Sequence, residues 1–254
     1  MTGSRHPIAH VIGAVLSDAR QHARITLDEA ARRLDTPTER LAHIESGHQR
    51  ATREELHRSC RLYGVSDEAS ALFRLQAGGW AQAVHQHDRE PGFAGRLAAV
   101  ARQSVRVRWL STHLLPPPLH TPAYAAAVHQ PAPTRPWPRL RSQDVVVLDE
   151  SVVRRGGATA ALMGEQIRHL LNVRNAGAQI HVVPALFPPG SYAELTLADA
   201  VTVLVAGGFS GAVYQATNVL ATHIDRALDQ PDPDRSHRLL TEAYAHHRTL
   251  REVW

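Results

Sequence analysis

Polar side chains that could bind a small molecule lie on both sides of a proline run in the middle of the chain. His113 precedes the run at 116–118, and His120 and Tyr124 follow it. The run is rigid because each proline fixes its own φ and restricts the residue before it. The neighbouring leucines add apolar surface, and this mixture is a common lining of small-molecule pockets. Arg155, which precedes two glycines, could meet an anionic group of the ligand. The alternative is that His120 and Tyr124 satisfy backbone groups of the loop while Arg155 faces solvent.

The sequence contains no nucleophile elbow, Walker loop or dinucleotide fingerprint. His85 and His87 have no third zinc ligand nearby, and the single Cys60 excludes both an internal disulfide and a multi-cysteine metal site. We therefore expect no metal and no cofactor. Acid–base catalysis needs no motif, so a cofactor-independent cyclase or isomerase stays open. Its candidate acids are Glu150, Glu165, Tyr192 and Glu194.

Residues 30–47, AARRLDTPTERLAHIESG, have the spacing of two short helices joined by a tight turn. Thr26 is the predicted N-cap of a helix over residues 27–34, and Asp35 tolerates the left-handed conformation that the turn requires. Thr36 followed by Pro37 predicts the start of the next helix, which ends at Gly47, and Thr52 starts a fourth helix. A unit of this shape can place its second helix in the major groove of DNA.

The second helix of this unit offers few side chains that read bases strongly. Its base-facing positions would be Thr38, Glu39, Ala42 and His43. Threonine can contact several base edges, and glutamate can accept a hydrogen bond from cytosine N4. Arg40 would lie toward the phosphates. The predicted DNA-binding set is Thr36, Thr38, Glu39, Arg40, His43 and Arg50.

The charge of this region is low for a DNA-binding domain. Residues 1–77 carry eleven arginines and ten carboxylates, a net charge of +1, whereas such domains usually present a basic face. Clustered arginines, or histidines charged below pH about 6.5, could compensate. Both interpretations therefore stay open: retained DNA binding, and a helix-turn-helix that keeps only its shape.

The 254 residues suffice for one large domain or two modest ones. Helical patterns occupy the first third, a polar stretch near residues 78–92 marks a boundary, and strands then alternate with helices. We predict a mixed α+β chain with an all-α domain over residues 1–79 and an α/β domain over residues 80–254. No run of apolar residues reaches membrane-spanning length and the start lacks a signal pattern, so we expect a cytoplasmic protein.

Residues 12–80 resemble the Xre-type helix-turn-helix domain, through GAVLSDARQHARITLDEAARRL, TPTERLAHIESG and ELHRSCRLYGVSDE. The remainder resembles the Scr1-like domain of unknown function that accompanies this helix-turn-helix in many actinobacterial regulators. Its signals are LLPPPLHTPAYAAAV, VVVLDESVVRRGG, MGEQIRHLL and AQIHVVP. Asp35 stands where the family usually has glycine. The resemblance implies a cytoplasmic, dimeric transcriptional regulator.

Besides a partner-binding module that acts through apolar C-terminal helices, two functions follow as hypotheses. The first is a DNA-binding transcriptional regulator whose C-terminal domain senses a ligand or dimerises, with operator DNA, a small molecule and a second copy of the chain as partners. The alternative is a regulator-like scaffold repurposed to bind or transform a small molecule, with weak or no DNA binding. The near-neutral first domain motivates this alternative.

Overall fold

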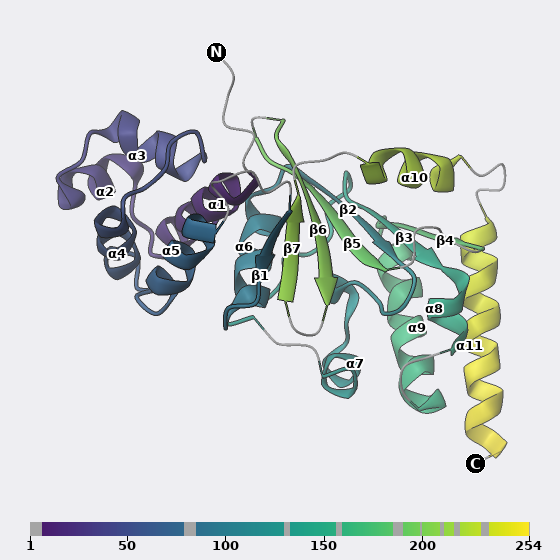
Figure 1. Cartoon of the computed structure of the whole chain (residues 1–254). Coiled ribbons are helices and arrows are strands. Elements are labelled where there is room, and N and C mark those ends of the chain that lie inside the picture. The colour runs from purple at the N-terminus through teal and green to yellow at the C-terminus, as the bar shows by residue number, and fades with distance from the viewer. Residues whose placement is uncertain are drawn as a thin grey trace.

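The computed structural model describes nine stretches of the chain, separated by short gaps (Figure 1). They are residues 7–78, 85–129, 133–155, 159–184, 190–198, 200–208, 211–215, 219–229 and 234–253.

Five helices form the N-terminal unit, which lies at one end of the molecule (Figure 1). They are α1 (Pro7–His22), α2 (Leu27–Leu34), α3 (Thr38–Glu45), α4 (Arg53–Leu62) and α5 (Glu68–Gly78). Their buried core includes Leu34, Leu41, Ile44 and Leu56. The helical character predicted for this third of the chain is confirmed.

Local capping explains where these helices begin and end. Thr26 accepts a hydrogen bond from the Glu29 amide, and Thr52 forms a full capping box with Glu55, as their positions predicted. Asp35 adopts the left-handed conformation, with φ of 50°. The predicted cap at Thr36 is wrong. Helix α3 begins at Thr38, with Pro37 in the capping position and no side-chain cap, and the Thr36 hydroxyl donates to the Leu34 carbonyl at 3.2 Å.

The described strands form a seven-stranded mixed sheet in the order β1-β7-β6-β5-β2-β3-β4. The strands are β1 (His85–Asp88), β2 (Arg106–Ser111), β3 (Val145–Asp149), β4 (Gln179–Val183), β5 (Ser191–Thr196), β6 (Thr202–Gly208) and β7 (Gly211–Gln215). Strands β2, β3 and β4 are parallel and the other pairings are antiparallel. The predicted combination of a helical region with a sheet-containing region is confirmed.

The two faces of the sheet are covered differently. The remaining helical elements are α6 (Phe93–Gln103), η1 (Pro117–Leu119), α7 (Pro122–Ala127), α8 (Glu150–Arg155), α9 (Ala160–Asn175), α10 (Val219–Leu228) and α11 (Arg235–Val253). The inner face packs against α1 and α6 at one end and against α8, α9 and α11 at the other (Figure 1). Among the described elements, α10 covers the outer face, where Ile224 and Ala227 join the apolar cluster of Leu110, Val145 and Val147.

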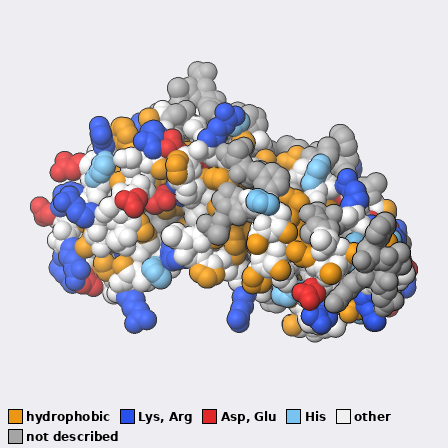
Figure 2. Space-filling model, turned by 90° about the horizontal axis from the view of Figure 1, so that it is seen from below, with side chains coloured by type: hydrophobic (Ala, Val, Ile, Leu, Met, Phe, Trp, Pro, Cys, Tyr) orange, Lys and Arg blue, Asp and Glu red, His pale blue; other side chains and the backbone are white. Residues whose placement is uncertain are grey.

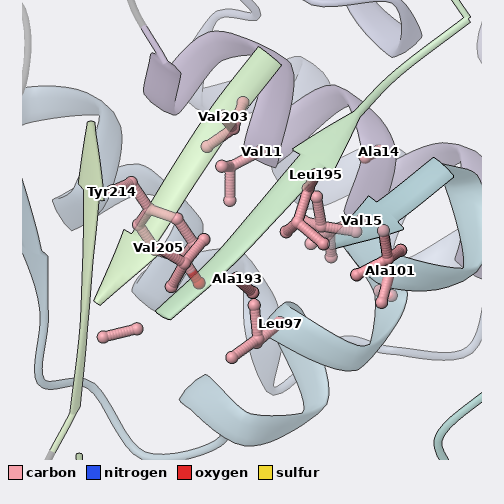
Figure 3. Packing of buried hydrophobic residues seen from close by; sticks show 14 of the residues in the cluster. Val11, Ala14, Val15, Leu97, Ala101, Ala193, Leu195, Val203, Val205 and Tyr214 are labelled. Atoms are coloured by element: carbon pink, nitrogen blue, oxygen red, sulfur yellow. The ribbon is translucent and has the colours of Figure 1, made fainter. Parts of the chain in front are cut away.

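Helix α1 belongs to both halves of the molecule. One side packs against α3, α4 and α5, and the other places Val11, Ala14 and Val15 against Leu195 and Val203 of the sheet and against α6 (Figure 3). Both of these sides of α1 are therefore buried. An α-helix that is apolar nearly all round is buried on all sides.

The proposed polar boundary near residues 78–92 contains a strand that the sequence pattern did not predict. His85–Asp88 forms β1, with His87 paired to Val213 of β7. Strand β5, helix α8 and the short 3-10 turn within the proline run are further elements that were not predicted. Each depends on tertiary contacts that a local pattern does not contain.

Candidate nucleic-acid interface

The N-terminal end of α3 is the exposed part of that helix. Thr38 and Glu39 are exposed, Arg40 and His43 are half-buried, and Leu41 and Ile44 point into the helical core. Helices α2, α3 and α4 lie at the end of the molecule farthest from α9 and α11 (Figure 1). The start of α3 is therefore free of the sheet and open to a partner.

The acidic residue near the end of α3 points inward. Glu45 accepts hydrogen bonds from Arg20 of α1 at 2.7 and 2.9 Å, and from the Tyr63 hydroxyl at 3.1 Å. Burial, followed by the Glu45 charge, raises the pKa of Tyr63. Because Glu45 is neutralised by Arg20 inside the fold, it does not repel DNA at the exposed face.

Arg40 is held by a partner within the protein. It donates to the carboxylate of Glu55 at 2.7 and 2.9 Å and to the Gln49 side chain at 2.9 Å. The hydrogen bond from Arg40 lowers the pKa of Glu55. Arg40 thus fixes α3 against the start of α4, and only part of its charge is left for a phosphate.

Three histidines meet at the C-terminal end of α3. The His10 Nδ1 donates to the Ser46 carbonyl at 2.8 Å, and the Ser46 hydroxyl lies 2.7 Å from the His48 Nδ1. The His48 ring centroid lies 6.0 Å from that of His10 and 6.2 Å from that of His43. Arg50 follows in the exposed loop. The fold thus gathers His43 and Arg50 at the end of the helix opposite Thr36, Thr38 and Glu39.

On the face seen in Figure 2, arginine and acidic side chains are interspersed over the helical unit. This mixture agrees with the small net charge of the first 77 residues. Phosphate attraction supplies most non-specific DNA affinity. Any DNA binding by this unit therefore depends on local contacts at α3 more than on a broad positive field.

Ion pairs join the helical unit to the sheet. Buried Asp18 of α1 accepts hydrogen bonds from Arg102 of α6 at 2.8 and 2.9 Å, and it also pairs with Arg135. Buried Arg96 of α6 binds Asp88 of β1 and reaches Glu68 of α5 at 2.5 Å. The direction of α3 relative to the sheet is fixed by these pairs and by the core around α1.

The four residues proposed to line a ligand pocket fall into two groups. His113 lies beside Thr112 at the end of β2, with its Nδ1 2.5 Å from the Thr112 hydroxyl. Arg155 of α8 reaches the Thr112 carbonyl at 3.5 Å and the Ser151 hydroxyl at 2.8 Å. Both candidates therefore contact Thr112 at the carboxyl end of β2, and α/β proteins commonly bind ligands at the carboxyl ends of parallel strands.

His120 and Tyr124 serve the backbone of the proline loop. The His120 Nε2 donates to the Leu115 carbonyl at 2.7 Å, and the Tyr124 hydroxyl accepts from the Leu115 amide at 3.4 Å. Their ring centroids lie 4.8 Å apart. Burial lowers the pKa of His120 and raises that of Tyr124. These contacts match the loop-supporting alternative, and a ligand role for the pair stays a prediction.

The candidate acids do not converge on one site. Glu150 pairs with Arg154, and Glu165 is exposed on α9. Glu194 is buried on β5 in an ion pair with Arg108. Arg108 was not predicted from the sequence, although arginines at alternate positions of an apolar strand were visible in VRVRWL.

In the part of the chain that the structure describes, no three His, Cys, Asp or Glu side chains group as metal ligands would. No helix of this part has the length and apolar character to cross a membrane.

Two protein-family models match the chain. A model described as a helix-turn-helix domain matches residues 11–73, and one described as a domain of unknown function (DUF5753) matches residues 94–242. The predicted order, an Xre-type helix-turn-helix followed by a domain of unknown function, is confirmed. Comparison with curated proteins and with solved structures finds no match.

Proposed function

The chain belongs to the family of the domain of unknown function DUF5753, here preceded by a helix-turn-helix domain, and we propose that it is a transcriptional regulator that binds DNA through α3. The observation that carries this proposal is the exposed start of α3, with Glu45 turned inward onto Arg20. The face that would enter the major groove is therefore less acidic than the sequence of the helix suggests.

Base recognition falls to the exposed N-terminal turn of α3. Thr38 and Glu39 contact base edges, and Glu39 favours a cytosine whose N4 donates to its carboxylate. His43 lies one helical turn further along the same helix. Arg50 contacts a phosphate, with a smaller contribution from Arg40 because Glu55 already holds its guanidinium. Thr36 is left out of these contacts, because its hydroxyl donates to the Leu34 carbonyl and its amide to the Ala31 carbonyl.

The C-terminal region is proposed to sense a ligand or to dimerise. A two-fold dimer would present two copies of α3 about 34 Å apart, one turn of DNA, to a palindromic operator. Sedimentation velocity measures the oligomeric state directly. A monomer at the concentration that saturates DNA would exclude the palindromic arrangement.

Fluorescence anisotropy with the DNA upstream of the protein's own coding region tests the proposal. We expect Arg50→Gln to weaken binding to all sequences and to reduce the salt slope by about 1. Glu39→Gln should instead change the preferred base at one position. Arg154→Gln is the control, because Arg154 is exposed on α8 at the end of the sheet farthest from α3 (Figure 1). Equal effects of Arg50→Gln and Arg154→Gln would contradict docking through α3.

A second function is favoured by the low charge of the helical unit and by the internal pairing of Arg40. In this alternative the helical unit is structural, and the chain binds or transforms a small molecule. The same anisotropy measurement separates the two functions. Wild-type protein that binds its upstream DNA no more tightly than unrelated DNA of equal length supports the alternative.

A further inference from the structure

An open cleft lies between α10 and the outer face of the sheet. Its volume is about 460 Å³, within the range of small-molecule sites. The cleft is lined by Val105, Arg106, Arg108, Glu194, Thr196, Thr202 and Ala221. None of the four pocket residues proposed from the sequence is among them.

The strand register arranges the polar side chains of the cleft in two rows. Arg106 of β2 pairs with Thr196 of β5, and Thr196 pairs with Thr202 of β6. Paired residues on neighbouring antiparallel strands have Cβ atoms about 5 Å apart. One guanidinium and two hydroxyls therefore stand side by side across three strands. In the next row, Arg108 pairs with Glu194 and Glu194 with Leu204.

The charged side chains of the second row are paired within the protein. Arg108 donates to both oxygens of Glu194, at 2.7 and 2.8 Å, and its remaining terminal nitrogen donates to Asp225 of α10 at 2.7 Å. Arg108 and Glu194 are both buried, so each needs the other. This row forms the cleft floor and connects the sheet to α10, and all three guanidinium nitrogens of Arg108 are engaged with carboxylates of the protein.

The first row retains an available cation. The Arg106 side chain is 46% exposed, and its ion-pair contact within the described residues is Glu194 at the long distance of 4.0 Å. Glu194 and Asp225 share Arg108, so the charges of these four side chains balance, and Arg106 is the more exposed of the two lining arginines. Thr196 and Thr202 add hydroxyl donors, while Val105 and Ala221 add apolar walls.

We propose that this cleft binds a small organic carboxylate, with the anionic group on Arg106, Thr196 and Thr202 and a short apolar body against Val105 and Ala221. The proposal rests on the ligand-sensing role proposed above for the C-terminal region and identifies its site and ligand class. The volume exceeds what inorganic phosphate occupies, and the apolar walls favour an aliphatic chain. A ligand here touches both the sheet and α10, so its binding stabilises the docked position of α10.

Saturation-transfer NMR with the full-length protein tests the proposal, using pentanoate, pentanamide and inorganic phosphate as probes. We expect pentanoate to bind, and pentanamide, which has the same shape without the charge, to bind at least about ten-fold more weakly. Arg106→Gln should weaken pentanoate binding by a similar factor, because it removes the charged hydrogen-bond donor. Thr202→Val should weaken pentanoate binding without altering the apolar walls. Arg154→Gln is the matched control, since its side chain is 45% exposed.

Three results would overturn the proposal: no binding of pentanoate to the wild type, equal binding of pentanoate and pentanamide, or equal affinity of the Arg106→Gln and Arg154→Gln variants. Phosphate binding as tight as that of pentanoate would assign the cleft to inorganic anions and overturn the organic ligand class. The outcome is separate from DNA binding. Pentanoate binding with no DNA binding refutes the regulator and keeps the site, and the reverse result refutes the site alone.

Discussion

The ion pair between Arg20 and Glu45 provides a direct test of how α3 is held. Their side chains are 13% and 6% exposed, and Glu45 accepts hydrogen bonds from Arg20 and from Tyr63. Glu45→Gln keeps the shape of the side chain and removes its charge. The Arg20 guanidinium then stays buried without a counter-charge, which costs about 3 kcal/mol. With a urea m-value of about 3 kcal/mol/M, the midpoint falls by about 1 M.

Urea unfolding followed by far-ultraviolet circular dichroism measures this change. The control is Glu29→Gln, which breaks the exposed pair between Arg33 and Glu29 on α2. An exposed pair one helical turn apart contributes about 0.3–0.5 kcal/mol, so this variant should unfold nearly as the wild type does. The double variant Arg20→Met, Glu45→Leu should recover most of the loss, because two apolar groups replace the buried charges.

The result that refutes the reasoning is a similar small effect for Glu45→Gln and Glu29→Gln. That outcome would mean that Glu45 reaches solvent, and its charge would then count against DNA binding at α3. If the Glu45 side chain is buried, the folded Glu45→Gln variant should bind DNA with wild-type affinity in the absence of urea.

Three further predictions concern the packing and the titration of buried groups. Gly13→Ala should destabilise the protein, because a Cβ there would lie 2.5 Å from a backbone oxygen of α3. Gly164→Ala should instead stabilise α9 by up to about 1 kcal/mol, because its Cβ would meet nothing closer than 3.9 Å. The thermal unfolding temperatures of the two variants test this difference. Burial lowers the pKa of His120 in the folded state, so the unfolded state binds more protons and stability should fall as pH drops below about 6.5. Because burial also lowers the pKa of His181, a His120→Phe variant should lose part of this dependence in urea titrations at pH 5 and 7. Asp18→Asn removes the negative charge and one of the two oxygens that Arg102 and Arg135 share, so hydrogen exchange in α1 should accelerate relative to α9.

Local signals in the sequence predicted the ends of helices but not all of the sheet. The caps at Thr26 and Thr52 and the left-handed Asp35 depend on residues within one turn, so the local pattern is sufficient. Strand β1 has no apolar alternation, and its identity comes from pairing with β7, more than 120 residues away in the chain. The predicted cap at Thr36 is wrong because the helix begins at Thr38, with Pro37 in the capping position.

The candidate site shows the same division between local and distant information. The exposure of Thr38 and Glu39 follows from helical spacing around Leu41 and Ile44. The inward direction of Glu45 does not, because its partner Arg20 lies 25 residues earlier on another helix. The cleft under α10 was equally hidden, since Arg106, Thr196 and Thr202 become neighbours only through the order of β2, β5 and β6.

Helix α1 couples the helical unit mechanically to the sheet, because it packs against both. Its two sides belong to the core around α3 and to the core on β5, β6 and α6, and Asp18 adds an ion pair to the second. Turning α3 relative to the sheet would therefore expose apolar surface on one side of α1 and separate a buried carboxylate from its arginine, and both changes are costly. A helix-turn-helix on a flexible linker could search for DNA independently of its neighbour. In this chain α1 replaces such a linker, so any change in the packing of the sheet that shifts α1 also shifts α3.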